Sequence, residues 1–143
     1  MSFSAERQAF ESKLNTVWAA SAYSTVPVWW ENTAFNVPDG VAYLAPTIVS
    51  LPSAQIEIGG LSDAVLNRYG GYMQIDIAVP EETGNDVARK MADVIANGFR
   101  RARLEVTGSG YIRCNVPELV NLGIRQGRYR LMVRIPYTRD KIE

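Results

Sequence analysis

The chain contains no histidine and only one cysteine among its 143 residues. Without histidine, no imidazole is available to activate a serine or cysteine nucleophile, to ligate a metal or to transfer protons near neutral pH. Cys114 alone cannot form an intrachain disulfide or a cysteine-based zinc cluster, and its strand-like context predicts a small buried side chain. These absences exclude most hydrolase mechanisms.

Long apolar runs are also absent, since no stretch approaches the ~20 apolar residues that cross a bilayer. The first residues, MSFSAERQAFE, carry charges and no apolar core segment. We therefore expect neither a signal peptide nor a membrane contact, and a protein made in the cytoplasm. A length of 143 residues with 47% apolar residues predicts one domain, 1–143, with a single core.

The net charge is zero, but the charges are unevenly distributed. Residues 1–84 contain three Lys or Arg against nine Asp or Glu, whereas residues 85–143 contain twelve against six. The two segments thus carry formal charges of −6 and +6. This polarity suits subunits that join head to tail, or a basic patch that contacts phosphate. Two plain solvated surfaces are the alternative.

Two amphipathic helices are predicted from apolar spacing. The first runs from about Ser4 to Ala20, with Ser2 or Ser4 as N-cap. Its apolar stripe is formed by Phe3, Phe10, Leu14, Val17 and Trp18. The second follows Thr83-Gly84-Asn85-Asp86, which has the form of a capping box. Its stripe is formed by Val87, Met91, Val94, Ile95 and Phe99.

Strand patterns lie between these helices. Residues 26–31 and 41–49 contain Pro27 and Pro46, which predict strand starts or edge strands. Residues 55–58 suggest a short strand. Residues 69–79 form a longer one, with paired glycines at 70 and 71 that indicate a bend or close backbone approach.

The last third returns to strands, at residues 104–106, 111–116 and 129–137. In the last of these, Leu131, Val133 and Ile135 alternate with polar residues, so they should face the core. The same register places Arg130 and Arg134 on the opposite face. The predicted fold class is α+β: a mainly antiparallel sheet with two helices packed on one face, in the order α-β-β-β-α-β-β-β.

Carboxylates are the remaining candidates for acid or base chemistry. Glu81 and Glu82 precede a helix, where the helix dipole favours negative charge. Asp86 and Asp93 lie two helical turns apart and do not converge. No phosphate-binding loop motif is present. We expect no catalytic residues and no cofactor, while a divalent ion held by loop acids stays open as an alternative.

The arginines of the C-terminal third are the main candidates for contact with a partner. Interleaved with Tyr111 and Tyr129, they could bind a phosphate backbone and stack on bases, or face a neighbouring subunit. The adjacent Trp29 and Trp30 should point to opposite faces of a strand, which favours an interface position for one of them. The candidate interface or lumen residues are Arg130, Arg134, Arg113, Arg128 and Trp30.

Between Phe35 and Phe99 the chain contains, in order, FNVPDG, VAYLAPTIV, IEIGG, YGGYMQIDIAVP and TGNDVARKMADVIANGF. This strand, strand, strand, helix series resembles the tail terminator-like family of long-tailed, lambda-type bacteriophages, and the similarity extends loosely from Phe3 to Tyr137. The resemblance implies a structural protein of the virion tail, assembled in the host cytoplasm. It implies a homohexameric ring that caps the tail tube, fixes tail length and presents the docking surface for the head.

The partners that the resemblance implies are the major tail tube protein and the head-tail connector protein. In such a ring the arginines would lie in a subunit contact, or in the lumen with non-specific contact to the genome DNA. The family has no catalytic residues to transfer, so we expect no enzyme. Two alternatives stay open: a head completion or neck protein, and a nucleic-acid-binding domain that uses the C-terminal arginines.

Overall fold

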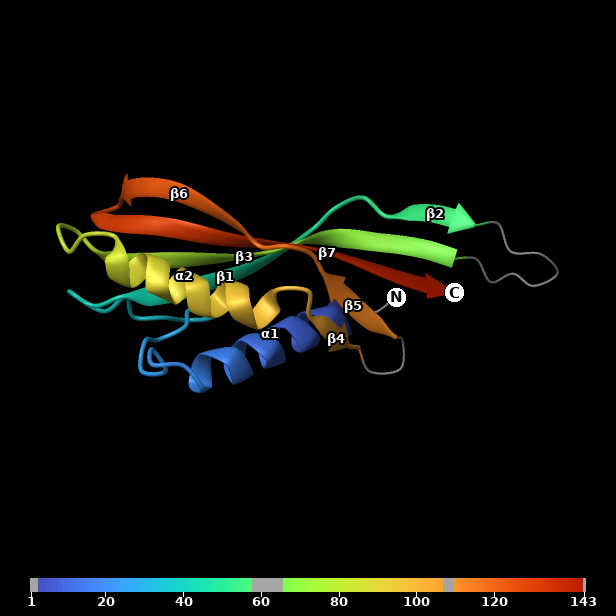
Figure 1. Ribbon diagram of the computed structural model, residues 1–143, viewed down its shortest axis with the longest axis horizontal. Helices are drawn as coiled ribbons and strands as arrows, with labels where there is room; N and C mark the ends of the chain where they lie inside the picture. The colour runs from blue at the N-terminus through green and yellow to red at the C-terminus, as the bar shows by residue number, and fades with distance from the viewer. Residues whose placement is uncertain (1–2, 58–65, 107–109, 143) are drawn as a thin grey trace.

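The computed structural model describes residues 3–57, 66–106 and 110–142. Within these residues, two α-helices lie on one face of a seven-stranded antiparallel sheet (Figure 1). The predicted α+β class, with both helices on one face, is confirmed. The elements are α1 (Phe3–Ala19), β1 (Tyr43–Ser50), β2 (Ala54–Glu57), β3 (Leu66–Pro80), α2 (Asp86–Phe99), β4 (Arg103–Glu105), β5 (Tyr111–Cys114), β6 (Glu118–Arg125) and β7 (Arg128–Ile142).

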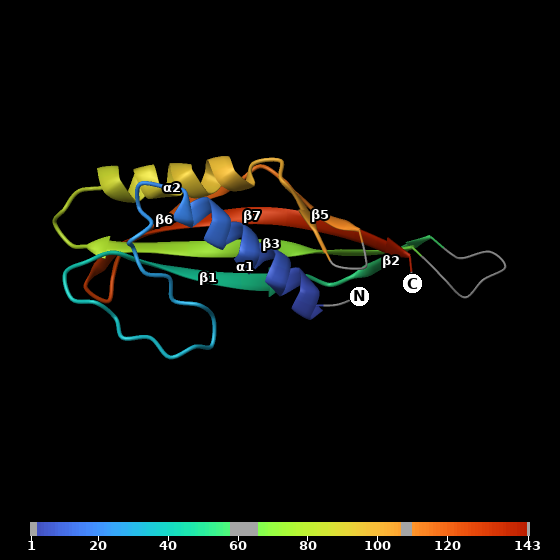
Figure 2. The ribbon, with the colours of Figure 1, turned by 90° about the horizontal axis from the view of Figure 1, so that it is seen from below.

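The sheet is built around β3 and β7, which pair with each other over their whole length. Along the other side of β3 lie β1 and then β2, while β6 and then β5 lie along the other side of β7. The hairpin of β4 and β5 bends toward the helices, as Figures 1 and 2 show together. One half of the sheet therefore has the strand order β1-β3-β7-β6.

The core lies between the sheet and the two helices. Alternate residues of β3 and β7 point toward the helices, because successive side chains of a strand point to opposite faces. The predicted core-facing residues of β7, Leu131, Val133 and Ile135, are all buried. They pack in one cluster with buried residues of both helices, among them Phe10, Leu14, Met91, Ile95 and Phe99.

Strand β1 lies at an edge of the sheet, as Pro46 predicts. Proline has no N–H to donate to a second neighbour, so it is tolerated where only one side of the strand is paired. The paired glycines of β3 mark a close approach of two backbones. A Cβ atom at Gly71 would lie 2.1 Å from the carbonyl oxygen of Val49 in β1, which leaves no room for a side chain.

The strand predicted at residues 26–31 is wrong. This segment forms one isolated parallel bridge, between Val28 and Leu44. The N–H of Trp29 donates to the Leu44 carbonyl at 2.7 Å, and the N–H of Leu44 donates to the Pro27 carbonyl at 3.0 Å. Pro46 is the next residue of β1 that faces this edge. Because proline has no N–H, the pairing with residues 27–29 cannot continue there.

The capping box predicted at Thr83 is also wrong. The Thr83 hydroxyl donates to the carbonyl of Pro80 at 2.7 Å, and the N-cap Asn85 makes no side-chain capping bond. Two residues of the predicted stripes are largely exposed, Phe3 at 59% and Val87 at 48%. In α2 the small residues Ala88 and Ala92 are buried instead, which brings the helix backbone close to the sheet.

The strand β6 was not predicted. Its sequence, ELVNLGIR, interrupts the apolar alternation, because the register against β7 shifts between Asn121 and Gly123. A bulge adds one extra residue to the strand, so the alternation of side chains between the two faces changes phase at that point. The predicted element order holds with this one strand added before β7.

Candidate functional site

The face of the sheet opposite the helices carries the predicted arginines, and we call it the open face. Alternate residues of β7, from Arg128 to Asp140, point to it. No helix of residues 3–57, 66–106 or 110–142 covers this face, since α1 and α2 both pack on the other one (Figures 1 and 2). The structure therefore presents a largely polar sheet surface to the surroundings.

Three arginines, Arg125, Arg128 and Arg130, lie at the end of the open face where β6 turns into β7, and Arg134 lies four residues further along β7. We call Arg125, Arg128, Arg130 and Arg134 the arginine cluster. Arg130 is held by three acceptors: its Nη2 lies 3.2 Å from both the Tyr43 hydroxyl and Gln126 Oε1, and its Nε lies 3.3 Å from the Arg125 carbonyl.

Arg128 fastens the segment before β1 to the sheet. It donates to the carbonyl of Val41 at 2.5 Å and to the carbonyl of Pro38. Its guanidinium also lies 5.0 Å from the centre of the Tyr43 ring, within the range of a cation–π contact. Arg128 thus has a structural role that does not require a partner molecule.

Arg134 contacts an aromatic ring of its own subunit. Its guanidinium lies over the Tyr72 ring, 4.8 Å from the ring centre. Its Nε is buried and has no hydrogen-bond partner among the described residues. Because an unpaired buried donor is costly, a carboxylate, carbonyl or phosphate from outside the subunit would be favoured here.

One carboxylate lies beside the cluster on the open face. Asp76 of β3 is half-buried, and this burial raises the pKa of its carboxyl, while the charges of Arg130 and Arg125 act in the opposite direction. The arginine cluster is therefore partly neutralised by a carboxylate of its own subunit.

Arg113 lies on the same face but does not join the cluster. It pairs with Asp140 at 3.2 Å, near the other end of β7. Asp140 also pairs with Arg68 at 2.8 Å. The hydrogen bond from Arg68 holds the pKa of the Asp140 carboxyl below its usual value, with a further contribution from Arg113.

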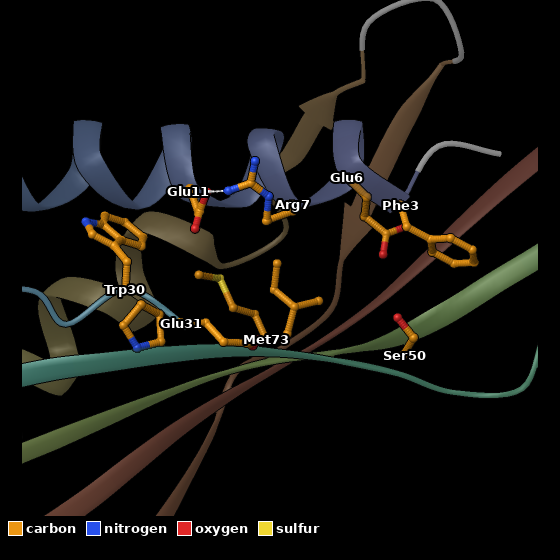
Figure 3. Close-up of a pocket in the computed structure, with 10 residues that line it drawn as sticks. Phe3, Glu6, Arg7, Glu11, Trp30, Glu31, Ser50 and Met73 are labelled. Carbon is orange, nitrogen blue, oxygen red and sulfur yellow. Dashed lines mark hydrogen bonds and ion pairs between the residues drawn. The ribbon is translucent and has the colours of Figure 1, made fainter. Parts of the chain in front are cut away.

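Trp30 lies on the helix side of the sheet, away from the arginine cluster. It lines a pocket of about 190 Å³ between α1 and β1, which Figure 3 shows. Met73 forms part of the apolar floor, and the walls carry three carboxylates, those of Glu6, Glu11 and Glu31. Trp29 points the other way and stacks on Phe35 with 5.4 Å between ring centres, so the predicted divergence of the two tryptophans is observed without a regular strand.

We call this depression the α1–β1 pocket. The other charged residue that lines the pocket is Arg7, which forms an ion pair with Glu11 at 2.7 Å (Figure 3). Glu6 lies 3.9 Å from the buried Arg139, so Glu31 is the lining carboxylate for which the described residues show no ion pair. The pocket consequently combines an apolar floor with one unpaired carboxylate.

A buried polar group under α1 was missed by the sequence reasoning. The Tyr137 hydroxyl donates to Glu6 Oε1 at 2.5 Å, and Arg139 Nη1 lies 3.9 Å from Glu6 Oε2. Burial raises the pKa of the Glu6 carboxyl, whereas the bond from Tyr137 and the charge of Arg139 lower it. A signal was present, since Glu6 precedes Phe10 by four residues and Arg139 continues the core-facing alternation of β7.

The described residues hold no group of three His, Cys, Asp or Glu side chains that could bind a metal ion. Burial raises the pKa of the Cys114 thiol to about 12, so this cysteine is not a thiolate at neutral pH. Within the same residues, neither helix has the length and apolar character required to cross a membrane.

Comparison with known proteins places the chain in a family. A family model described as phage tail terminator protein matches residues 7–137. A solved structure shares the fold with a TM-score of 0.69, at 22% sequence identity, over 100% of this chain and 96% of that chain. No curated protein matches the sequence.

Proposed function

The chain belongs to the phage tail terminator protein family, whose members are structural proteins of the phage tail, and we propose that it caps the tail tube as a homohexameric ring. In this proposal residues 1–143 act as one tail terminator-like domain. The ring fixes tail length and presents the surface on which the head docks. It is assembled in the host cytoplasm from subunits that perform no catalysis.

The arginine cluster on the open face is the observation that carries the proposal beyond the family. Arg128 and Arg130 are held by acceptors of their own subunit, so the positive charge is fixed in position. Arg134 keeps a buried Nε that has no hydrogen-bond partner in the part of the chain that the structure describes. A preorganised surface of this kind loses little side-chain entropy when it binds carboxylates or phosphates.

In the ring, the cluster would meet either an acidic surface of the neighbouring subunit or the genome that passes through the lumen. The first arrangement uses the opposite charges of residues 1–84 and 85–143 in a heterologous contact, the type that closes into rings. Other partners are the major tail tube protein on one side and the head-tail connector protein on the other. A head completion or neck protein would present similar surfaces and is the nearest alternative.

The experiment adds purified protein to tail tubes of the same phage and examines their ends by electron microscopy. The variant is Arg130→Gln with Arg134→Gln, which removes two charges without placing a new carboxylate beside Asp76. A matched control, Lys90→Gln with Arg101→Gln, removes two exposed charges on and just after α2, away from the arginine cluster. We expect capped tubes with the wild type and the control, and at least about a tenfold weaker capping with the cluster variant.

Wild-type protein that leaves the tube ends uncapped would refute the proposed function. Equal capping by the cluster variant would remove the arginines from the proposal and leave the family role. A DNA-binding role instead predicts affinity for duplex DNA that falls steeply with salt and is lost in the cluster variant. Filter binding at two salt concentrations separates these outcomes.

A further inference from the structure

The outer edge of β1 exposes backbone groups that no described residue pairs. Leu44 directs both its N–H and its carbonyl away from β3, toward Pro27 and Trp29. Backbone direction alternates along a strand, so Ile48 and Ser50 also direct theirs away from β3. Neither has a backbone partner on that side among the described residues. This edge can therefore accept another strand.

The pairing register also gives the direction of the backbone N–H and carbonyl groups in β3, β7 and β6. In an antiparallel pair, opposite residues either bond to each other or both point away. Ile77 is opposite Leu44, so it bonds to β7 through its partner Leu131. Met132, the next residue of β7, must then point toward β6.

This places the free backbone groups of β6. Val120 is opposite Met132 and bonds to it, so the neighbouring Leu119 and Asn121 direct their N–H and carbonyl groups away from β7. The exposed apolar side chains of Leu119 (43%) and Ile124 (65%) lie on this strand as well. Unpaired edges with apolar side chains are templates for pairing with another chain.

We propose that β6 of one subunit pairs with β1 of the next and seats its apolar side chains at the α1–β1 pocket. The occupant of the β1 edge is thus a second copy of this chain. The inference rests on the proposed function, because it supplies the contact by which a ring of identical subunits closes. It adds to that function the two strands that form the interface.

The directions of the strands agree with this pairing. The half-sheet β1-β3-β7-β6 has four antiparallel strands, so its first and last strands run in opposite directions. When subunits repeat head to tail, β6 of one subunit is consequently antiparallel to β1 of its neighbour. A rotation that repeats this contact can close into a ring.

The side-chain faces agree as well. Ile48 is opposite Met73, and Leu119 is opposite Val133, so both outward-bonding residues carry their side chains on the helix face. Residues opposite each other in a pair share a face. A joined sheet would therefore keep the helices of both subunits on one side. A mismatch here would have excluded the contact.

The α1–β1 pocket fits the β6 side of a neighbour in polarity and charge. Its lining includes Pro46 and Ile48 of β1, the strand with the free edge. Met73, labelled in Figure 3, lies beside them. Leu119 and Ile124 of the second copy would reach this floor. The carboxylates of the pocket would then lie near the α2 flank of that copy, where Arg89 and Arg100 are exposed. Charge and apolar area thus select a second copy over an acidic partner.

Two proline variants test the pairing. Ile48→Pro removes an outward N–H from β1, and Leu119→Pro removes one from β6, while neither touches a bond inside the subunit. We expect each to raise the concentration for half-assembly by at least about tenfold, with the melting curve of the monomer retained. The matched controls Ile48→Val and Leu119→Val keep the N–H and should assemble as the wild type does. Sedimentation velocity over a concentration series measures all five proteins.

A mixture of the two proline variants sharpens the test. Each retains one good edge, so an equimolar mixture should form dimers and no larger species. Ile124→Glu supplies an independent β6 variant, which changes a side chain and no backbone group, and it should also block assembly.

Three results would overturn the inference: a wild type that remains monomeric at millimolar concentration, proline variants that assemble as well as their valine controls, or a mixture that forms no dimer. Assembly that survives all edge variants while tubes are still capped leaves the proposed function standing on another surface. Edge-dependent assembly by a protein that never caps a tube would refute the proposed function and keep the inference.

Discussion

The two faces of the sheet are made from the same strands but are built on different physical principles. On the helix face, β3 and β7 bury apolar side chains against α1 and α2. On the open face, the same strands present arginines that are half-buried or exposed and paired with carboxylates, carbonyls and rings. One face lowers the free energy of the folded subunit by burial, and the other offers fixed charge to a partner.

The exception on each face shows how this separation is maintained. The helix face contains the buried Glu6, which is satisfied by Tyr137 and lies near Arg139. The open face contains Tyr43, which is buried under the segment fastened by Arg128. The polar Glu6 is therefore tolerated in the core because it is hydrogen-bonded, and the Tyr43 ring is tolerated on the open face because other residues shield it from water.

The largest effect is expected from placing a charge on the wrong face. Val133→Asp puts a carboxylate at a position that is 1% exposed in the core. An unpaired buried charge costs several kcal/mol, which is a large share of the ~5–15 kcal/mol that stabilises a domain. Circular dichroism should show an unfolded or aggregated protein. The neighbouring Arg134→Gln, on the open face, should melt close to the wild type, and a folded Val133→Asp protein would contradict the assigned register.

An intermediate effect is expected at the polar group of the core. Tyr137→Phe removes the hydroxyl that donates to Glu6, and the loss should be about 1–3 kcal/mol in a denaturation experiment. The bond favours the carboxylate form, so its removal should raise the pKa of Glu6 further above the ordinary 4.5.

The raised pKa of Glu6 makes the stability of the fold depend on pH. A carboxyl whose pKa is raised in the folded state stabilises the fold below its unfolded pKa, and this stabilisation is lost as pH rises through the folded pKa. The Tyr137→Phe protein should therefore lose stability with rising pH over a wider range than the wild type. Glu6→Gln should remove the dependence, and identical pH profiles for all three proteins would contradict the assignment.

The smallest effect is expected on the open face at Asp140. Its pKa is lowered by Arg68 and Arg113, so the pairing stabilises the fold above the unfolded pKa and is lost as pH falls below the ordinary 3.8. Asp140→Asn should cost less than Tyr137→Phe at neutral pH, because exposed ion pairs contribute little. The difference from wild type should vanish in acid, and a constant difference at all pH values would indicate a role other than charge.

Local patterns were sufficient for most of the fold. The alternation in residues 129–137 predicted which face of β7 is buried, and Pro46 predicted the edge position of β1. Arg130 and Arg134 were assigned to the open face by the same period of two. Arg113 was not assigned to a face from the sequence, and the pairing of β5 with the far end of β7 separates it from the cluster.

Other features depended on contacts between distant segments. The strand β6 was missed because a bulge breaks its period, and the strand proposed at residues 26–31 is reduced to one bridge. Glu6 and Arg139 are 133 positions apart and meet only when α1 packs on β7. No local pattern reports such a meeting, since it depends on how a helix crosses a sheet.

The sequence by itself determined the fold class and the faces of the central strands, because side-chain periodicity is a local property of the backbone. It also determined the absence of histidine chemistry and the unequal charge of the two segments. Only the tertiary structure decided which arginines form one cluster, where the α1–β1 pocket lies and which strand edges stay unpaired. These features arise from pairing and packing between segments far apart in the chain, whose geometry is set by the burial of the core as a whole.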